Sequence, residues 1–177
     1  MPRKFIVEVA VSADGYIARG DGSFDFLDRP APPGHYGMKA FLKTIDAIVW
    51  GRKTWDMAVM MGSVNAFGPK VRNHVFSRSL PSNPGTSAEF VRESPAEFAK
   101  RERGEPGKNL WIMGGGEIIA SFLEAGAIDE FIITTIPVMI GEGIPLLRAK
   151  PTTVELNLLS ARRYPDGVLR SHYRVAR

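Results

Sequence analysis

The chain has 177 residues, 44% of them hydrophobic and 24% charged, a composition that excludes extended disorder and predicts one soluble domain over residues 1–177. It contains no cysteine, which excludes disulfides and zinc–thiolate sites, and no signal peptide or membrane-spanning stretch is recognisable, so we expect a cytoplasmic protein with no membrane partner. The formal net charge of +4 suits a phosphate-rich small ligand, and because the basic residues are scattered we expect no nucleic-acid partner.

The first third of the chain predicts two strands separated by a long loop. Residues 4–11, KFIVEVAV, are dense in β-branched and aromatic residues and run into a turn. Residues 17–37 are rich in Gly, Asp and Pro, and a loop of this length in a compact domain is usually functional or disordered. A short helix is predicted over 38–44, then a buried strand over 47–51 and a helix that begins with RKTWD.

The rest of the chain continues the alternation and ends in a hairpin. A helix from 94 to about 104 is predicted to begin at Ser94, with Pro95 at its first position and Glu97 at its third. Two further strands, joined through Pro165-Asp166-Gly167, close the chain. The remaining segments are strands at 73–80, 88–93, 109–113 and 129–139, a helix at 117–125, and the hairpin strands at 153–164 and 168–176.

This order of elements predicts an α/β fold. Strands that alternate with helices form a mostly parallel sheet with helices on both faces, and the last two strands add an antiparallel hairpin. In such sheets ligands bind where the carboxyl ends of the strands meet the first turns of the following helices. The unusual strand-to-helix junctions are therefore the candidate sites.

Gly51-Arg52-Lys53-Thr54 follows an apolar strand directly. Glycine permits close backbone approach, and the helix start, two cations and a hydroxyl together would hold a phosphate. The alternative is an ordinary solvated helix start, although cations there oppose the helix dipole. The upstream glycine of a Walker loop is missing.

Two further junctions have a similar character. Ser77-Arg78-Ser79 places two hydroxyls around a guanidinium, which suits a single phosphate group, or else forms an ordinary polar turn. Gly114-Gly115-Gly116 precedes Glu117 at the start of a predicted helix. It is not a Rossmann fingerprint, because Ile119 occupies the last glycine position.

Five segments in this order resemble the dihydrofolate reductase-like fold, with the closest similarity to the reductase domain of bacterial riboflavin biosynthesis and its stand-alone relatives. Together they span nearly the whole chain. They are SADGYIA (12–18), DAIVWGRKTWD (46–56), VFSRS (75–79), WIMGGGEIIASFLEAGAIDEF (111–131) and PVMIGEGIPLL (137–147).

The resemblance implies that NADPH lies across the carboxyl ends of the strands and that the Gly114–Gly115 peptide bond is cis. It also implies a homodimer formed through the C-terminal strands and residues 137–147. Position by position, it assigns Gly51, Arg52, Lys53 and Thr54 to the diphosphate; Ser77, Arg78 and Ser79 to the adenosine 2′-phosphate; Met113, Gly114, Gly115, Gly116, Glu117 and Ile118 to the diphosphate and nicotinamide; and Ala10 and Ile17 to the sides of the nicotinamide.

The substrate side departs from the folate reductases, which carry a buried acid on the helix after the long loop. Here that helix reads MKAFLKTI and has no acid. Glu8, Asp25 and Asp28 are the candidate replacements, with Glu8 and Asp25 taken as the catalytic candidates. Glu8 lies in an apolar strand. Its carboxyl group is expected either to be buried, with a raised pKa and a role as proton donor, or to be held in a salt bridge or exposed to water. Asp25 alternatively orders its loop.

The chain is therefore expected to be an NADPH-dependent reductase acting on a small heterocycle, like the ribosylamino-pyrimidine phosphate of riboflavin synthesis. A dihydrofolate or pterin reductase and a nucleotide-binding module without turnover are the alternatives. No metal site is expected, because His35, His74 and His172 have no metal-ligand spacing.

Overall fold

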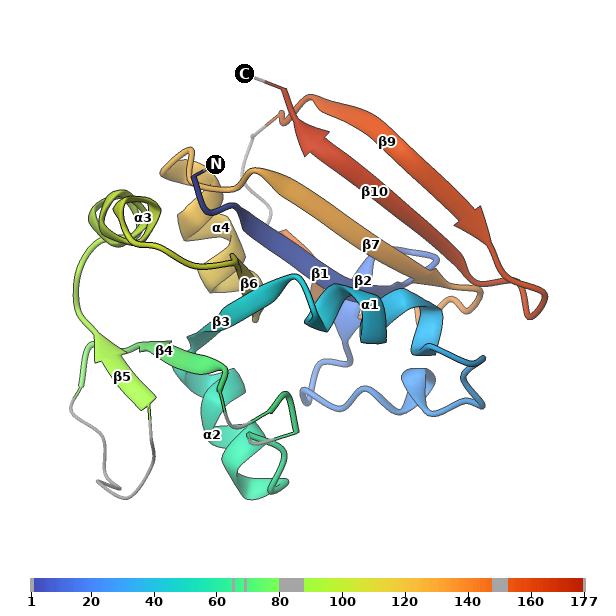
Figure 1. Ribbon diagram of the computed structural model, residues 1–177. Helices are drawn as coiled ribbons and strands as arrows, with labels where there is room; N and C mark the ends of the chain where they lie inside the picture. The colour runs from blue at the N-terminus through green and yellow to red at the C-terminus, as the bar shows by residue number, and fades with distance from the viewer. Residues whose placement is uncertain (1, 65, 69, 80–87, 148–152, 177) are drawn as a thin grey trace.

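The computed structural model describes residues 2–64, 66–68, 70–79, 88–147 and 153–176, so that Leu80, at the end of one predicted strand, lies outside the described residues. One eight-stranded sheet, in the order β5-β4-β3-β6-β1-β7-β10-β9, forms the centre of the molecule (Figure 1). Its strands are β1 (Phe5–Ser12), β3 (Ile45–Gly51), β4 (Arg72–Phe76), β5 (Ala88–Val91), β6 (Asn109–Gly114), β7 (Glu130–Ile136), β9 (Leu156–Arg163) and β10 (Leu169–Val175).

The strand directions agree with the expected α/β architecture. Neighbouring strands from β5 to β7 are parallel, whereas β10 is antiparallel to β7 and β9 is antiparallel to β10. The carboxyl ends of the six parallel strands therefore lie along one edge of the sheet, which is where the candidate junctions were expected.

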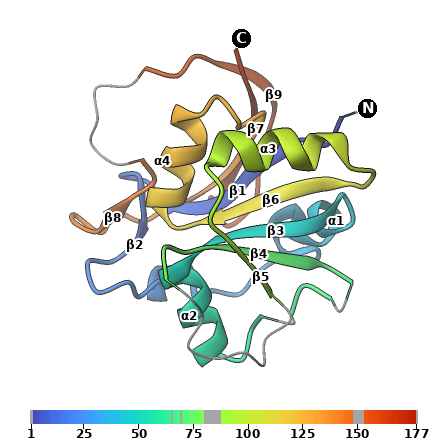
Figure 2. The same cartoon turned by 90° about the vertical axis from the view of Figure 1, so that its left-hand side faces the viewer.

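Helices cover both faces of the sheet, as the sequence predicts (Figure 2). On one face α3 (Pro95–Gly104) and α4 (Gly116–Glu124) bury an aromatic cluster around Phe5, Phe98 and Phe122. On the other face lie α1 (Met38–Leu42) and α2 (Arg52–Met60), with a core that contains Trp50, Trp55 and Trp111. The two cores hold the sheet rigid under the carboxyl edge.

The first turn of α3 has the predicted cap. The Ser94 hydroxyl accepts a hydrogen bond from the Glu97 backbone N–H, and the Glu97 carboxylate accepts one from the Ser94 backbone N–H. Local sequence alone was enough to predict this boundary, because both partners lie within one helical turn.

The segment 17–37 was predicted to be a loop, but in the structure its first residues belong to a short strand. β2 (Tyr16–Ala18) pairs with β8 (Ile144–Pro145) in a separate two-stranded sheet. Two short 3-10 helices, η1 (Asp25–Leu27) and η2 (His35–Gly37), follow before α1. The strand was missed because its partner lies far along the chain and local composition carries no sign of it.

Gly143→Ala is expected to destabilise the contact between β2 and β8. A Cβ on Gly143 would lie 2.3 Å from the Ala18 backbone oxygen, a distance that forces the two strands apart. Overpacking of this kind costs about 1–3 kcal/mol of the free energy of unfolding. Urea denaturation measures the change; Gly20→Ala, where a Cβ meets nothing within 4 Å, is the control. Equal stability of the two variants would contradict the prediction.

Among the described residues, no helix is long and apolar enough to cross a membrane.

Candidate active site

The strand-to-helix junctions after β3 (residues 51–54) and after β6 (residues 114–118) lie directly against each other. A Cβ on Gly51 would lie 3.4 Å from the Gly114 backbone oxygen and 3.5 Å from the Gly115 nitrogen, and one on Gly115 would lie 3.4 Å from the Thr54 hydroxyl oxygen. A Cβ at either position would make ordinary van der Waals contacts with the other junction, so the two junctions are packed against each other. Two features that are far apart in the sequence form one wall of a single site.

The backbone conformation of the β6 junction favours glycine at Gly114. Gly114 has a φ of +116°, and the Gly114–Gly115 peptide bond is cis, which confirms the expectation from the resemblance. Gly116 lies against the end of β8, because a Cβ there would lie 3.0 Å from the Pro145 backbone oxygen and 3.4 Å from the Leu146 backbone oxygen. The three glycines are thus a place of close approach and not an ordinary turn.

Both helices that leave these junctions start without a side-chain cap. Gly51 and Gly115 are the N-cap residues of α2 and α4, and neither provides a side-chain capping hydrogen bond. Uncapped N–H groups at a helix start, together with the helix dipole, favour an anion. The two helix starts offer such groups on the same edge of the sheet.

The junction after β4 (residues 77–79) joins the same site through Arg52. The Arg52 guanidinium donates to the Ser77 hydroxyl at 3.4 Å, and its Nε lies 2.8 Å from both carboxylate oxygens of Asp56. The Ser77 hydroxyl in turn donates to the Ser79 backbone oxygen at 2.9 Å. Arg52 therefore links the start of α2 to the β4 junction.

Two exposed cations of these junctions have no acidic partner. Neither Lys53 nor Arg78 makes an ion pair within the part of the chain that the structure describes, and both side chains are exposed. Positive charge that no carboxylate neutralises favours the binding of an anionic ligand. The β3 and β4 junctions each contribute one such residue.

The other residues assigned to the cofactor lie around the same edge. Ala10 is half-buried on β1 and pairs with Thr134 of β7, and Ile17 lies half-buried on β2. Around the glycines, Met113 is half-buried, Ile118 is buried and Glu117 is exposed. These positions border the β1 and β6 ends of the edge.

Glu8 lies in the core on the face of the sheet that carries α1. Its side chain is 5% exposed, and the Oε1 atom is 3.7 Å from Nη2 of Arg170, an ion pair longer than a hydrogen bond. Burial raises the pKa of Glu8 to about 7, although the positive charge of Arg170 acts in the opposite direction. The carboxyl group is thus both buried and paired, which combines the two alternatives left open by the sequence.

Arg170 is the functional candidate that sequence reasoning missed. It lies on β10, and its guanidinium packs against Gly37, where a Cβ would lie 3.2 Å from Cζ. Its Nε is buried and has no hydrogen-bond partner among the described residues. No local pattern distinguishes Arg170 from the other basic residues of the C-terminal hairpin, because its contact with Glu8 depends on the strand order.

Asp25 is held within the long loop. It forms an ion pair with Arg19 at 2.5 Å, is 63% exposed, and has a pKa below its usual range because Arg19 donates hydrogen bonds to it. The structure records no contact between Asp25 and Glu8 or Arg170 in the described ranges. These contacts favour the loop-ordering role. Asp28 shows no contact with the pair either.

The histidines and acids of the described residues include no group of three that could hold a metal ion. His74 is buried and lies 2.9 Å from Glu89, and His172 lies 2.9 Å from Glu130. Neither histidine belongs to the three junctions.

Comparisons with known proteins place the chain among reductase-like domains. The model of the RibD C-terminal domain matches residues 97–170. The uncharacterized protein YwjB of Bacillus subtilis (strain 168) is 37% identical over 173 residues, which cover 98% of each chain. A solved protein from Shewanella sp. PV-4, provisionally assigned to riboflavin biosynthesis, has 27% identity and a TM-score of 0.85, with 100% of both chains covered.

Two more distant structures share the fold. The deaminase/5-amino-6-(5-phosphoribosylamino)uracil reductase of Thermotoga maritima has a TM-score of 0.73 and 14% identity. The match covers 99% of this chain and 57% of the Thermotoga chain. Dihydrofolate reductase from Enterococcus faecalis, solved with NADP(H), has a TM-score of 0.69 and 16% identity, with 98% of this chain and 97% of that chain covered. The dihydrofolate reductase-like fold expected from the sequence is confirmed.

Proposed function

This chain belongs to the RibD C-terminal domain family, and from that premise we propose that it is an NADPH-dependent reductase. It transfers a hydride to a small heterocyclic substrate that resembles 5-amino-6-(5-phosphoribosylamino)uracil. The observation that carries the proposal is the meeting of three phosphate-type junctions, after β3, β4 and β6, at one edge of the sheet. Membership of this family supports an oxidoreductase role. The identity of the cofactor as NADPH and the class of substrate are proposed here.

The residues present fit NADPH. The junctions after β3 and β6 are packed against each other, so that the starts of α2 and α4, each with glycine as its N-cap, lie close together and suit a diphosphate. Ser77, Arg78 and Ser79 supply hydroxyls and a guanidinium for the 2′-phosphate, with Arg52 bonded to Ser77 from the other side. The proposed 2′-phosphate site at Ser77, Arg78 and Ser79 is the reason to prefer NADPH, because NADH lacks this phosphate.

Glu8 and Arg170 would act on the substrate. The bound cofactor supplies a hydride, and the reduced product also needs a proton. Glu8, with a pKa of about 7, holds a proton at its carboxyl group near neutral pH and can donate it. Arg170, whose Nη2 lies 3.7 Å from the Glu8 Oε1, positions that carboxyl group. Orienting the two reactants supplies the rest of the catalysis.

Thermal unfolding in the presence of nucleotides tests the cofactor. NADPH at a hundred times its dissociation constant should raise the free energy of unfolding by about 2.7 kcal/mol, since it binds only the folded state. NADP⁺ should also stabilise the protein, whereas NADH, FMN and folate should have smaller effects. Stabilisation by NADH but not by NADPH would contradict the assignment of Ser77, Arg78 and Ser79.

Oxidation of NADPH, followed at 340 nm with pyrimidine and pterin substrates, tests turnover. A loss of absorbance with an aminopyrimidine ribotide supports the proposed substrate, and a loss with dihydrofolate alone supports a folate-type reductase. Binding of NADPH without turnover on any of these compounds identifies a nucleotide-binding module instead.

The activity should decline as pH rises through about 7, because Glu8 loses the proton it donates above its pKa. The pH dependence of kcat under saturating NADPH measures this effect. Glu8→Gln should lower kcat and remove the limb of the profile near pH 7. A variant that keeps the same pH profile would exclude Glu8 as the donor.

The outer surface of the C-terminal hairpin favours a homodimer. β9 is the last strand of the sheet, and all eight of its residues are exposed. Leu156, Leu158 and Leu169 expose apolar side chains there, with Leu158 58% exposed. Apolar groups clustered on an edge strand mark a surface for association. We propose that a second copy of the chain covers it.

Leu158→Glu should convert the dimer into a monomer, because a charge would be buried in the apolar contact. Light scattering after gel filtration, at micromolar concentrations, measures the mass. Asn157→Glu, the neighbouring position on the other side of β9, is the matched control and should remain dimeric. A monomeric wild-type protein under the same conditions would refute the proposed assembly.

A further inference from the structure

The turn from Gly34 to Gly37, directly before α1, has an unusual backbone. All four of its residues have a positive φ, between +49° and +90°, and two of them, His35 and Tyr36, are not glycine. The left-handed region is uncommon for residues other than glycine, and such a conformation persists only where the surrounding structure fixes it. Specific contacts are therefore expected to hold this turn.

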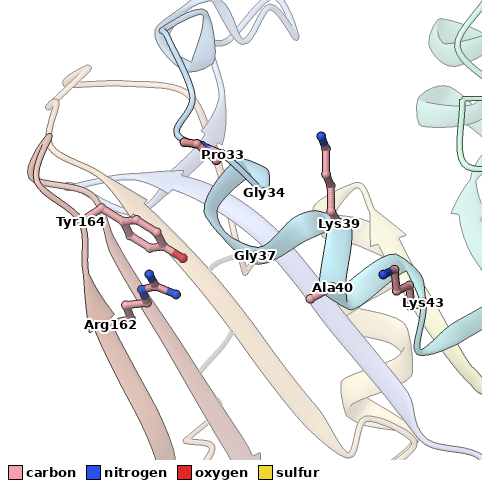
Figure 3. A pocket seen from close by; sticks show the side chains of 8 residues that line it. All are labelled: Pro33, Gly34, Gly37, Lys39, Ala40, Lys43, Arg162 and Tyr164. Carbon is pink, nitrogen blue, oxygen red and sulfur yellow. The ribbon is translucent and has the colours of Figure 1, made fainter.

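Tyr36 attaches the turn to the C-terminal hairpin. Its hydroxyl donates a hydrogen bond to the carboxylate of Asp166, and its ring packs edge-on against Tyr164, with the ring centres 5.1 Å apart. Gly34, Gly37 and Tyr164 line one hollow of about 410 Å³, so the turn and the hairpin lie opposite each other (Figure 3). A polar contact and an aromatic contact thus hold Tyr36 in its left-handed conformation.

Asp166 is itself fixed in the loop of the hairpin. Its carboxylate accepts a hydrogen bond from the Val168 backbone N–H at 3.3 Å. Arg29 donates to the Asp166 backbone oxygen at 3.2 Å, and Leu27 and Tyr36 pack against the small core cluster that contains Val168. The hydrogen bond from Tyr36 lowers the pKa of Asp166, so this carboxylate is ionised at neutral pH and is a strong acceptor.

At its other end the turn contacts the guanidinium of Arg170. A Cβ on Gly37 would lie 3.2 Å from both Cζ and Nη1 of Arg170, so the Gly37 backbone lies directly against the guanidinium. Nη2 of the same group is 3.7 Å from Oε1 of Glu8. The buried Nε has no hydrogen-bond partner among the described residues. Packing against Gly37 therefore restricts where the guanidinium can lie.

We propose that Asp166 and Tyr36 are positioning residues for Glu8, the proposed proton donor. Their contact fixes the turn, and the turn confines the guanidinium of Arg170 beside Glu8. The inference rests on the proposed function, because it takes Glu8 to supply the proton. It adds that the hairpin loop, far from Glu8 along the chain, sets the geometry of the donor through Arg170.

Loss of the contact between Tyr36 and Asp166 has a defined electrostatic consequence. Once the turn is released, the guanidinium of Arg170 can move away, and its positive charge then lowers the pKa of Glu8 less. Tyr36→Phe and Asp166→Asn should therefore both raise this pKa. Loss of the Asp166 charge without any movement acts in the opposite direction, because removing a negative neighbour favours the ionised form of Glu8.

The other ionisable groups on the elements around Glu8 are the same in these variants. Among the described groups, Arg170 is the one whose charge and hydrogen bonding lower the pKa of Glu8. The remaining groups, on the turn, α1 and its end, β7 and β10, are His35, Lys39, Lys43, Glu130, His172 and Arg174.

Carbon-13 NMR of protein labelled at the glutamate carboxyl carbons tests the proposal without cofactor or substrate. A pH titration gives the pKa of Glu8, whose signal is the one missing from Glu8→Gln. Arg170→Gln should raise this pKa by roughly one unit or more, the effect of losing a nearby opposite charge. Tyr36→Phe, which keeps the ring that packs on Tyr164, and Asp166→Asn should shift it in the same direction.

Two matched controls should titrate like the wild type. Tyr173→Phe removes a hydroxyl from the opposite face of β10, since Tyr173 and Arg170 are an odd number of residues apart on that strand. Asp21→Asn removes a carboxylate whose hydrogen bond, from the Ser23 backbone N–H, lies within its own turn of the long loop. An unchanged or lowered pKa of Glu8 in Tyr36→Phe or in Asp166→Asn would overturn the inference.

The titration uses the free protein, so it separates this inference from the proposed function. In an active enzyme, the decline of kcat with rising pH should move to higher pH in Tyr36→Phe by the same amount as the pKa of Glu8. If the pKa rises but no compound is reduced by NADPH, the contact positions Glu8 and the proposed reaction is wrong. If NADPH is oxidised and the pKa is unchanged, the proposed function stands and the inference is wrong.

Discussion

The free energy of unfolding of the Glu8→Gln variant is expected to rise relative to that of the wild type by about 3 kcal/mol between pH 4.5 and pH 8. Burial raises the pKa of Glu8 from 4.5 in the unfolded chain to about 7 in the folded protein. Between these values the folded state holds a proton that the unfolded state has released. The contribution of Glu8 to stability therefore falls as pH rises through this window and is constant above it.

Urea denaturation at several pH values measures the effect, and the difference between the two proteins removes all titrations they share. The Glu8–Arg170 ion pair forms only when Glu8 is ionised, so its effect is already contained in the folded-state pKa of Glu8. A cost of the substitution that does not depend on pH shifts the whole curve without changing its slope. Glu105→Gln, an exposed carboxyl at the end of α3, is the control for a lost surface charge. A Glu8→Gln curve parallel to the wild type across the window would show that Glu8 is not buried as a neutral acid.

Arg78→Gln is expected to weaken NADPH binding by about 10- to 100-fold, the cost of a lost charge-assisted contact of roughly 1.5–3 kcal/mol. Binding of NADH should change little, because NADH lacks the 2′-phosphate that Arg78 is proposed to hold. Arg78 is exposed and makes no ion pair in the described ranges, so its removal should leave the fold intact.

Fluorescence titration with both nucleotides measures the two dissociation constants. Arg163→Gln, an exposed arginine on β9, removes the same charge away from the cleft and should bind NADPH like the wild type. Equal weakening of NADPH and NADH by Arg78→Gln would indicate that Arg78 contacts a part common to both. The preference for NADPH would then need another origin.

The two catalytic candidates show how far sequence reasoning extends. Glu8 was recognised because a carboxyl group among apolar strand residues is costly unless it is neutral or paired, and the structure shows it buried beside Arg170. Asp25 was the second candidate, with loop ordering as its alternative role, and its contact with Arg19 lies within its own loop. Only the fold distinguishes an acid that faces the core from one that faces solvent.

Local sequence determined the elements of this protein and the junctions between them. Alternating apolar segments define strands and helices, a capping box defines the start of α3, and Gly114 has a backbone conformation, with a φ of +116°, that other residues rarely adopt. Each of these depends on interactions between neighbours in the chain. The dihydrofolate reductase-like fold could therefore be identified from five short segments.

The tertiary structure decided which distant residues share a site. Arg170 faces Glu8, and Arg162 lies beside Arg170, because β10 and β9 follow β7 in the sheet. The pairing of β2 with β8 also joins segments far apart in the chain. Strand order and register are set by the packing of the whole sheet, so the sequence predicted the phosphate-type junctions but not the contact between Glu8 and Arg170.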